Sequence, residues 1–226
     1  MAPDTLSLAG KTAIVTGSGR ENGIGAAIAT ALARNGANVS KVAAGIEVLG
    51  DKTLVVQADV STPEGAAKLI KQTLDGFKTD KIDILINSAD AGTGQAKLLV
   101  DVTPDEAAAP YIPSGGRIVN IGTVVTKMEN MRGVGLYGSS KAAQQYLTNA
   151  LAAELGPSKG ITVNTIAPGP TKTDAASWFP EGSLKTRLGK VAGDAEEVAD
   201  AVLLMVSDSA RWITGQYIAA SGGITA

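Results

Sequence analysis

Tyr137 and Lys141 stand four residues apart, where a helical segment begins. Side chains at positions i and i+4 of an α-helix lie on one face, so the phenol and the ammonium can project into one site. A free phenol has a pKa of about 10, which is too high for ready proton exchange at neutral pH. A neighbouring cation favours the phenolate and lowers that pKa. The pair can therefore act as a general acid or base toward an alcohol or a ketone.

The same spacing is compatible with a solvated lysine beside a packed tyrosine, so the rest of the chain has to decide between the two interpretations. The sequence contains no cysteine and no histidine. Disulfides, thiol nucleophiles, histidine-based triads and most zinc enzymes are thereby excluded, and we predict no bound metal. Acid–base chemistry must rest on tyrosine, lysine, aspartate or glutamate.

The composition favours a single α/β domain, because 226 residues with 44% hydrophobic content are enough for one substantial core. A net charge of −2 and an aromatic content of 4%, without any basic run, argue against a nucleic-acid partner. The chain shows neither a signal-peptide pattern nor an apolar stretch long enough to cross a bilayer. We expect a cytoplasmic protein without membrane contact.

Short β-branched runs alternate with helical patterns along the chain. Runs that are apolar throughout and separated by helices indicate a parallel sheet that is covered on both faces. We therefore predict one doubly wound (Rossmann) domain over residues 1–226, in three layers α/β/α. The expected strands are 12–15, a strand ending at 40, 54–56, 82–86, 116–121, 161–166 and 216–219, and the expected helices are 24–35, a helix opening at 62–64, 137–155 and 194–206.

The pattern is interrupted at two places. Residues 103–106 form a strong helix start, yet Pro110 and Pro113 follow at once and the announced helix does not appear. A strand should end at Ser40, but a helical stretch begins at Lys41 with almost no turn. We infer that the sequence as given omits segments at these two places, near 40–41 and 90–110, and we expect a third omission near 185–187. The alternative is that the protein itself has lost these segments.

Residues 16–25 form a glycine-rich loop between the first expected strand and the first expected helix. Glycines at this position allow a tight turn and let the backbone approach the pyrophosphate of a dinucleotide. The helix N-terminus then faces the phosphate with free N–H groups and a positive dipole end. An ordinary turn is the alternative, but this placement favours nucleotide binding. The cofactor-binding residues expected here are Gly17, Ser18, Arg20, Gly23 and Ile24.

Arg20 in this loop indicates which cofactor is used. A planar guanidinium can bind the 2′-phosphate that distinguishes NADPH from NADH, although the residue could equally be an ordinary surface charge. We expect NADPH to be preferred.

Several segments in the expected order resemble the short-chain dehydrogenase/reductase family, in the branch of single-domain carbonyl reductases that includes the 3-oxoacyl-ACP reductases. The likeness covers nearly the whole chain. It is carried by residues 10–17, 58–60, 86–89, 137–141, 163–170, 213–216 and 221–223.

The resemblance implies a nicotinamide cofactor and roles for three catalytic residues. Tyr137 matches the acid/base that protonates the carbonyl oxygen as hydride arrives. Lys141 matches the lysine that lowers the tyrosine pKa and hydrogen-bonds the nicotinamide ribose. Thr123 stands where the family usually has a serine that orients the substrate oxygen, and the alternative is a threonine that merely ends a strand.

The resemblance also implies further contacts with the cofactor. The adenine is expected beside Asp59 and Val60, and a cofactor ribose beside the backbone of Asn87 and Ala89. The nicotinamide end is expected beside Pro168 and Gly169, with Thr171 or Thr173 at its carboxamide.

Besides Thr123 in place of the usual serine, the sequence departs from the family pattern in three ways. The glycine loop is two residues longer than the family norm, and Glu21 and Asn22 are the expected insertion. Asp90 stands where the family usually has glycine, so an inward-pointing carboxylate would be unfavourable near a pyrophosphate. The helix expected after residues 103–106, which carries a catalytic asparagine and part of a subunit interface in the family, is not found.

Two functions remain in competition. The first is NADPH-dependent reduction of a ketone to a secondary alcohol, reversible and with Tyr137 as acid/base. The second is a nucleotide-binding protein of the same fold without redox turnover, motivated by Asp90 and the absent helix. An enoyl reductase is a weaker rival, because those relatives usually space the tyrosine and lysine further apart.

Substrate and assembly are only outlined by the sequence. The substrate is a small ketone or alcohol, whose identity residues 172–187 should set. There Trp178 and Phe179 could form an apolar lid or belong to the core. A polyketide-type aromatic ketone, a β-ketoacyl thioester and a simple ketone are all candidates. The resemblance and the alanine-rich residues 142–153 favour a homotetramer or dimer, although packing within one chain is the alternative.

Overall fold

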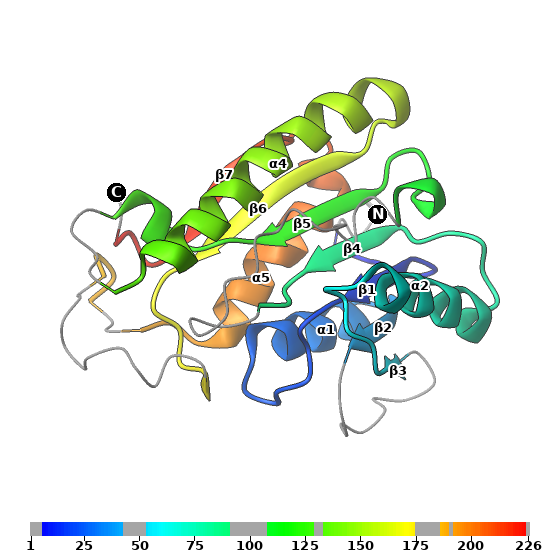
Figure 1. The fold of residues 1–226 in the computed structure, drawn as a ribbon, viewed down its shortest axis with the longest axis horizontal. Helices are drawn as coiled ribbons and strands as arrows, with labels where there is room; N and C mark the ends of the chain where they lie inside the picture. The colour runs from blue at the N-terminus through cyan, green and yellow to red at the C-terminus, as the bar shows by residue number, and fades with distance from the viewer. Residues whose placement is uncertain are drawn as a thin grey trace, which may run out of the picture.

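The computed structural model describes residues 6–42, 53–90, 108–128, 133–174, 186–189 and 192–224. These residues form one parallel sheet with the strand order β3-β2-β1-β4-β5-β6-β7 (Figure 1). The strands are β1 (Thr12–Val15), β2 (Asn38–Val42), β3 (Thr53–Val56), β4 (Ile84–Asn87), β5 (Arg117–Ile121), β6 (Thr162–Pro168) and β7 (Tyr217–Ala220). The helices are α1 (Ile24–Arg34), α2 (Pro63–Phe77), α4 (Gly135–Lys159) and α5 (Ala195–Val206), with short 3₁₀ turns η1 (Ala109–Tyr111), η2 (Val124–Lys127) and η4 (Asp208–Ala210).

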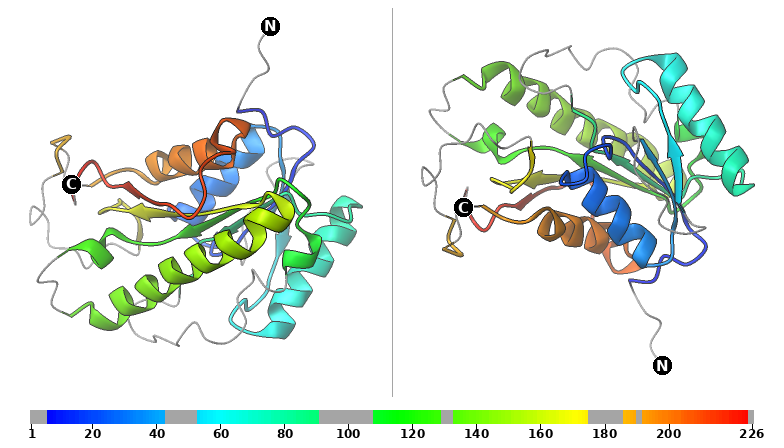
Figure 2. Two further views of the ribbon diagram at one scale, coloured as in Figure 1. Left: turned by 90° about the horizontal axis from the view of Figure 1, so that it is seen from above. Right: turned by 90° about the horizontal axis from the view of Figure 1, so that it is seen from below.

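Hydrophobic cores lie on both faces of the sheet. Because successive side chains of a strand point to opposite faces, Ala13 and Val15 of β1 enter one core and Ile14 enters the other. The first core packs against α1 and α5, and the second against α2 and α4, as the edge-on views of Figure 2 show. The predicted three-layer, doubly wound parallel sheet is therefore confirmed.

The strand order reverses between β1 and β4. From β1 the chain proceeds to β2 and β3 on one side, and from β4 it proceeds to β5, β6 and β7 on the other. The connections diverge at this switch point, which leaves a crevice at the carboxyl ends of the strands where ligands bind in this type of sheet.

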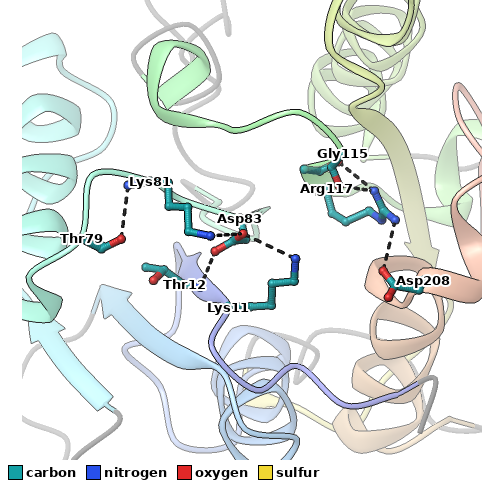
Figure 3. A network of polar contacts seen from close by, with 9 residues as sticks. Lys11, Thr12, Thr79, Lys81, Asp83, Gly115, Arg117 and Asp208 are labelled. Carbon is teal, nitrogen blue, oxygen red and sulfur yellow. Dashed lines mark hydrogen bonds and ion pairs between the residues drawn. The ribbon is translucent and has the colours of Figure 1, made fainter. Parts of the chain in front are cut away.

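Charged side chains hold the amino ends of the two central strands β1 and β4 together (Figure 3). The buried carboxylate of Asp83, just before β4, accepts a hydrogen bond of 2.9 Å from the N–H of Thr12 in β1. The ammonium groups of Lys11 and Lys81 each lie 3.6 Å from the same carboxylate. This network fixes β1 against β4 at their amino ends, on the side away from the crevice.

Most element boundaries fall within a few residues of the predicted ones, but two predictions were wrong. Lys41 does not begin a helical stretch, because β2 continues to Val42 and Lys41 pairs with both Val15 of β1 and Val55 of β3. Helix α4 does not end near 155 but runs to Lys159, where Gly160 adopts the left-handed conformation that ends it.

Several other predictions lie outside the described residues. These are the helix start at 103–106 and the side chains of Trp178 and Phe179. The inferred gaps at 90–110 and 185–187 also fall largely there.

Candidate active site

A cavity of about 570 Å³ opens at the carboxyl ends of β1, β4, β5 and β6. It brings together eleven of the predicted site residues from segments far apart in the sequence. They are Gly17, Arg20, Gly23, Ile24, Thr123, Tyr137, Lys141, Pro168, Gly169, Thr171 and Thr173.

The glycine loop is pressed against the end of β4. Gly17 has a φ of +65°, and a Cβ placed on it would lie 2.6 Å from the backbone of Ala89. The side chain of Thr16 holds the two segments together, since its hydroxyl accepts hydrogen bonds of 3.0 Å from the N–H groups of Ser88 and Ala89. Gly25 is equally constrained, because a Cβ there would lie 2.6 Å from the carbonyl oxygen of Gly17. The backbone can take this path only with glycine at both positions.

The N-terminus of α1 faces the cavity. The N-cap residue is Gly23, and the first turn of α1 carries no acidic side chain. Gly23, Ile24 and Gly25 all line the cavity, together with the cationic Arg20. Backbone N–H groups, a positive dipole end and a guanidinium suit a phosphate-bearing ligand, so these residues fit the dinucleotide predicted for this loop.

Tyr137, Thr123 and Lys141 converge on the other side of the cavity. Thr123 follows β5 and caps η2, where its hydroxyl accepts a hydrogen bond of 3.3 Å from the N–H of Val125. Its side chain is also hydrogen-bonded to the phenol of Tyr137. Lys141 is buried one helical turn beyond Tyr137, and its ammonium donates a 2.9 Å hydrogen bond to the carbonyl oxygen of Ile121. The predicted trio therefore shares one site.

The charge balance at Tyr137 differs from the prediction. We expected the ammonium of Lys141 to lower the pKa of Tyr137. Instead burial raises the pKa of Tyr137, the negative charge of Asp90 raises it further, and the hydrogen bond with Thr123 opposes both. Burial of the phenol is the largest cause, and the carboxylate of Asp90 that contributes the negative charge lies 3.2 Å from the ammonium of Lys141. Asp90 thus points into the cavity, toward the lysine.

The remaining five predicted residues lie outside the lining of this cavity. Buried Ser18 donates its hydroxyl proton to the carbonyl oxygen of Val15 at 3.1 Å, which shapes the loop. Asp59 caps a turn by accepting hydrogen bonds from the N–H and hydroxyl of Ser61, at 3.0 and 2.6 Å. Val60 packs against the core under α2.

The other two of the five, Asn87 and Ala89, join neighbouring strands and loops. The amide nitrogen of Asn87 donates a 2.8 Å hydrogen bond to the side-chain oxygen of Asn120 in β5. Ala89 is held through its backbone N–H by Thr16. In this structure both residues fix the framework of the site.

Further cavity residues were not singled out from the sequence as cofactor or catalytic residues. The carboxyl-end rule for parallel strands predicts the residues that directly follow β1, β4, β5 and β6, whereas lining residues further from the strand ends, such as Met128 and Asp174, carry no local signal. These additional lining residues are Gly19, Gly25, Ser88, Asp90, Ile121, Gly122, Val124, Val125, Met128, Pro170 and Asp174.

A parallel sheet in this strand order, with a glycine loop before α1 and the cavity at the switch point, defines a dinucleotide-binding α/β protein. Comparison with known proteins specifies the class. The family model described as "short chain dehydrogenase" matches residues 11–111, and the one described as "Enoyl-(Acyl carrier protein) reductase" matches residues 105–225. The chain belongs to the short-chain dehydrogenase/reductase family and is an NAD(P)-dependent oxidoreductase.

The chain is similar to individual relatives over nearly the whole length of both sequences. The chain is 34% identical to the 3-oxoacyl-(acyl-carrier-protein) reductase FabG of Pseudomonas aeruginosa, over 97% of this chain and 99% of the relative. It superimposes with a TM-score of 0.79 on a short chain dehydrogenase from Burkholderia cenocepacia J2315 in complex with NADP, at 32% identity over 97% and 99% of the two chains. It also superimposes on the promiscuous reductase LugOII, described as catalysing keto-reduction at C1 during lugdunomycin biosynthesis, with a TM-score of 0.81 and 30% identity over 97% and 99%.

Within the described residues, no helix is both long enough and apolar enough to cross a membrane.

Proposed function

We propose that this protein reduces a ketone to a secondary alcohol with NADPH, in a reversible hydride transfer that uses Tyr137 as acid/base. The observation that carries the proposal is the meeting of Tyr137, Thr123 and Lys141 in the same cavity as the glycine loop and Arg20. A proton donor and a phosphate-binding loop in one cavity are what reduction by a dinucleotide needs.

When bound, the nicotinamide cofactor supplies the hydride that the carbonyl carbon accepts. The chain's own residues manage the proton. Tyr137, whose phenol is protonated at neutral pH, donates that proton to the carbonyl oxygen. The hydroxyl of Thr123, already hydrogen-bonded to the phenol, is placed to hold the same oxygen.

The choice of NADPH rests on Arg20 and on relatives. Arg20 lines the cavity beside the N-terminus of α1, where a guanidinium can bind a 2′-phosphate through two parallel hydrogen bonds. The Burkholderia cenocepacia relative was solved with NADP, which is consistent with this choice.

The substrate class follows from the relatives' chemistry as a proposal. FabG is named for a 3-oxoacyl substrate and LugOII is described by a keto-reduction, so a ketone is favoured over an enoyl group. We place a 3-oxoacyl thioester and a polyketide-type ketone first among the candidates. The protein is further proposed to act in the cytoplasm as a homo-oligomer.

The test is cofactor consumption in the presence of a panel of ketones. The purified protein is mixed with NADPH and with aliphatic, aromatic and 3-oxoacyl ketones, and the loss of NADPH absorbance is followed. Tyr137→Phe should lower the rate by at least about a thousandfold, because the proton donor is lost. Tyr146→Phe is the matched control, since Tyr146 lies on the same helix with 76% of its surface exposed. Turnover that survives Tyr137→Phe would contradict the proposal.

One observation favours the second candidate, a nucleotide-binding protein without redox turnover. The ammonium of Lys141, which should contact the cofactor ribose, is already paired with Asp90 and Ile121. Under this alternative the protein would bind NADPH tightly, as measured by quenching of cofactor fluorescence, and would leave every ketone of the panel unreduced.

A further inference from the structure

Asp90 forms a contact that the sequence pattern gave no reason to expect. It follows β4 at the wall of the cavity, and its carboxylate lies 3.2 Å from the ammonium of Lys141. The lysine side chain is only 7% exposed, whereas that of Asp90 is 36% exposed. A buried ammonium is stabilised by a close carboxylate, and the second partner, the carbonyl oxygen of Ile121, completes its hydrogen bonding on that side. The pair is therefore a built part of the site.

The pair also determines the electrostatic surroundings of the Tyr137 phenol. An isolated ammonium near the phenol would favour phenolate, but the carboxylate of Asp90 cancels much of that field and adds a negative charge of its own. Burial and Asp90 together raise the pKa of Tyr137. Among the described residues, the charged groups that line the cavity with the phenol are Arg20, Asp90, Lys141 and Asp174. Two more titratable groups lie near Thr123: Tyr217, whose hydroxyl donates a 3.0 Å hydrogen bond to the carbonyl oxygen of Thr123, and Lys127, whose ammonium lies over the Tyr217 ring.

Among these groups only Asp90 combines a negative charge with direct contact to Lys141. Asp174, the other carboxylate of the cavity, is exposed and accepts a hydrogen bond of 3.5 Å from the side chain of Asn22. Lys127 stacks over the ring of Tyr217, with 5.5 Å between its ammonium and the ring centre. Of the two carboxylates, only Asp90 contributes to the raised pKa of Tyr137.

We propose that Asp90 is a positioning residue which, by holding Lys141 in an ion pair, keeps the Tyr137 phenol in its proton-donating form and so adapts the site to ketone reduction rather than alcohol oxidation. The proposal deepens the function proposed above and rests on it. Reduction consumes a phenolic proton, which passes to the carbonyl oxygen as the hydride reaches the carbon. Oxidation of an alcohol runs the same step backwards and needs the phenolate to accept the hydroxyl proton.

The consequence for pH depends on the sign of the effect. A phenol whose pKa is raised stays protonated to higher pH, so reduction should persist further into the alkaline range. Oxidation should start only at correspondingly higher pH, because phenolate is scarce below the raised pKa. The overall equilibrium between ketone and alcohol is unchanged, since an enzyme cannot alter it. What Asp90 sets is the pH range in which each direction runs fast.

The test is a direct titration of Tyr137 in the protein without cofactor. Phenolate absorbance is followed against pH in the wild type and in Asp90→Asn, and the curve of the matching Tyr137→Phe variant is subtracted from each to isolate this tyrosine. We expect the midpoint in Asp90→Asn to fall by about one pH unit or more, because a close negative charge is removed and Lys141 is released. The pH profile of alcohol oxidation with NADP⁺ should move down by the same amount.

Two control variants separate charge from structure. Asp90→Glu keeps the carboxylate and should return the midpoint toward that of the wild type. Asp174→Asn removes the other cavity carboxylate and should leave the midpoint in place. Should Asp90→Asn fold poorly, as judged by circular dichroism, Asp90→Gly serves in its stead and carries the same expectation.

The outcomes distinguish this inference from the proposed function. An unchanged Tyr137 midpoint in a folded Asp90→Asn variant, while the wild type reduces ketones, overturns the role of Asp90 alone. A lowered midpoint without turnover on any ketone supports the effect on the phenol and overturns the reductase assignment on which the directional role depends. A lowered midpoint together with a shifted oxidation profile supports both.

Discussion

Asn120 on β5 donates a hydrogen bond of 2.9 Å to the hydroxyl of Thr148 on α4. The side-chain oxygen of Asn120 in turn accepts a 2.8 Å hydrogen bond from Asn87 on β4. Asn120 and Thr148 are fully buried and Asn87 nearly so, and their chain of amide and hydroxyl groups crosses from the sheet to the helix beneath the cavity. It fixes the rotation of α4, and therefore the direction in which Tyr137 and Lys141 point.

Thr148→Val should disturb both stability and catalysis. The substitution keeps the shape of the side chain but leaves the amide of Asn120 without its acceptor, at a cost of about 1–3 kcal/mol in the free energy of unfolding. We also expect kcat to fall more than KM changes, because α4 can then rotate slightly and misplace the phenol.

The matched control is Ser158→Ala on the same helix. Its hydroxyl is exposed and donates to the carbonyl oxygens of Glu154 and Leu155 within the same helix. The cost should stay within about 0.5 kcal/mol by urea unfolding. Equal effects of the two substitutions would contradict the role assigned to Thr148.

The sheet and the helices that place the site could be predicted from the sequence because their signals are local. Apolar runs such as residues 84–86, within the predicted strand 82–86, favour central strands of a covered sheet. Thr62 followed by Pro63 marks the start of α2, where the Thr62 hydroxyl accepts a 3.1 Å hydrogen bond from the N–H of Gly65. The glycine loop and the i, i+4 spacing at Tyr137 likewise depend on neighbours in the sequence.

The features that escaped prediction depend on contacts between distant segments. The pairing of Asp90 with Lys141 joins residues 51 positions apart in the sequence, and the raised pKa of Tyr137 comes from its burial first and from the charge of Asp90 second. The continuation of β2 through Lys41 is likewise decided by its two neighbouring strands rather than by its own residues. Local propensity cannot report such partners.

Gly17→Ala should damage the cofactor loop through steric overlap. The added methyl would lie 2.6 Å from backbone atoms of Ala89 and Ser88. Because these are backbone atoms, a change of side-chain rotamer cannot relieve the overlap. We expect a loss of about 2–4 kcal/mol in the free energy of unfolding, from overpacking and the positive φ together, and a weaker NADPH affinity by fluorescence titration.

Gly10→Ala separates the two causes. Gly10 has a φ of +77°, but a Cβ there would meet nothing within 4 Å. The control should therefore show only the conformational cost, about 1 kcal/mol, and an unchanged NADPH affinity. If Gly10→Ala and Gly17→Ala weaken NADPH binding alike, close packing of the loop is not the reason for the glycine.

Asp83→Ala should lower stability without changing the site. The substitution removes the acceptor of the Thr12 N–H and the shared partner of Lys11 and Lys81. These groups lie at the amino ends of the strands, whereas the cavity lies at their carboxyl ends. We expect a loss of about 1–3 kcal/mol by chemical denaturation, with the Kd for NADPH unchanged below the transition. Asp75→Ala, which breaks an exposed ion pair with Lys71 on α2, is the control and should cost at most about 0.5 kcal/mol. A change in NADPH affinity caused by Asp83→Ala would contradict this prediction, because it would show that the amino ends of the strands influence the cavity at their carboxyl ends.

Arg20→Ala should change the choice of cofactor. Arg20 lines the cavity at the N-terminus of α1, so loss of its guanidinium should weaken NADPH binding about tenfold or more and leave NADH binding within about twofold. The difference should shrink as salt is added, because the contact with the 2′-phosphate is electrostatic. Arg34→Ala is the matched control, since Arg34 lies in the last turn of the same helix, at the end away from the cavity. Isothermal titration of both cofactors against the three proteins measures the effect, and equal losses of NADPH and NADH affinity in Arg20→Ala would assign the residue to the pyrophosphate common to both.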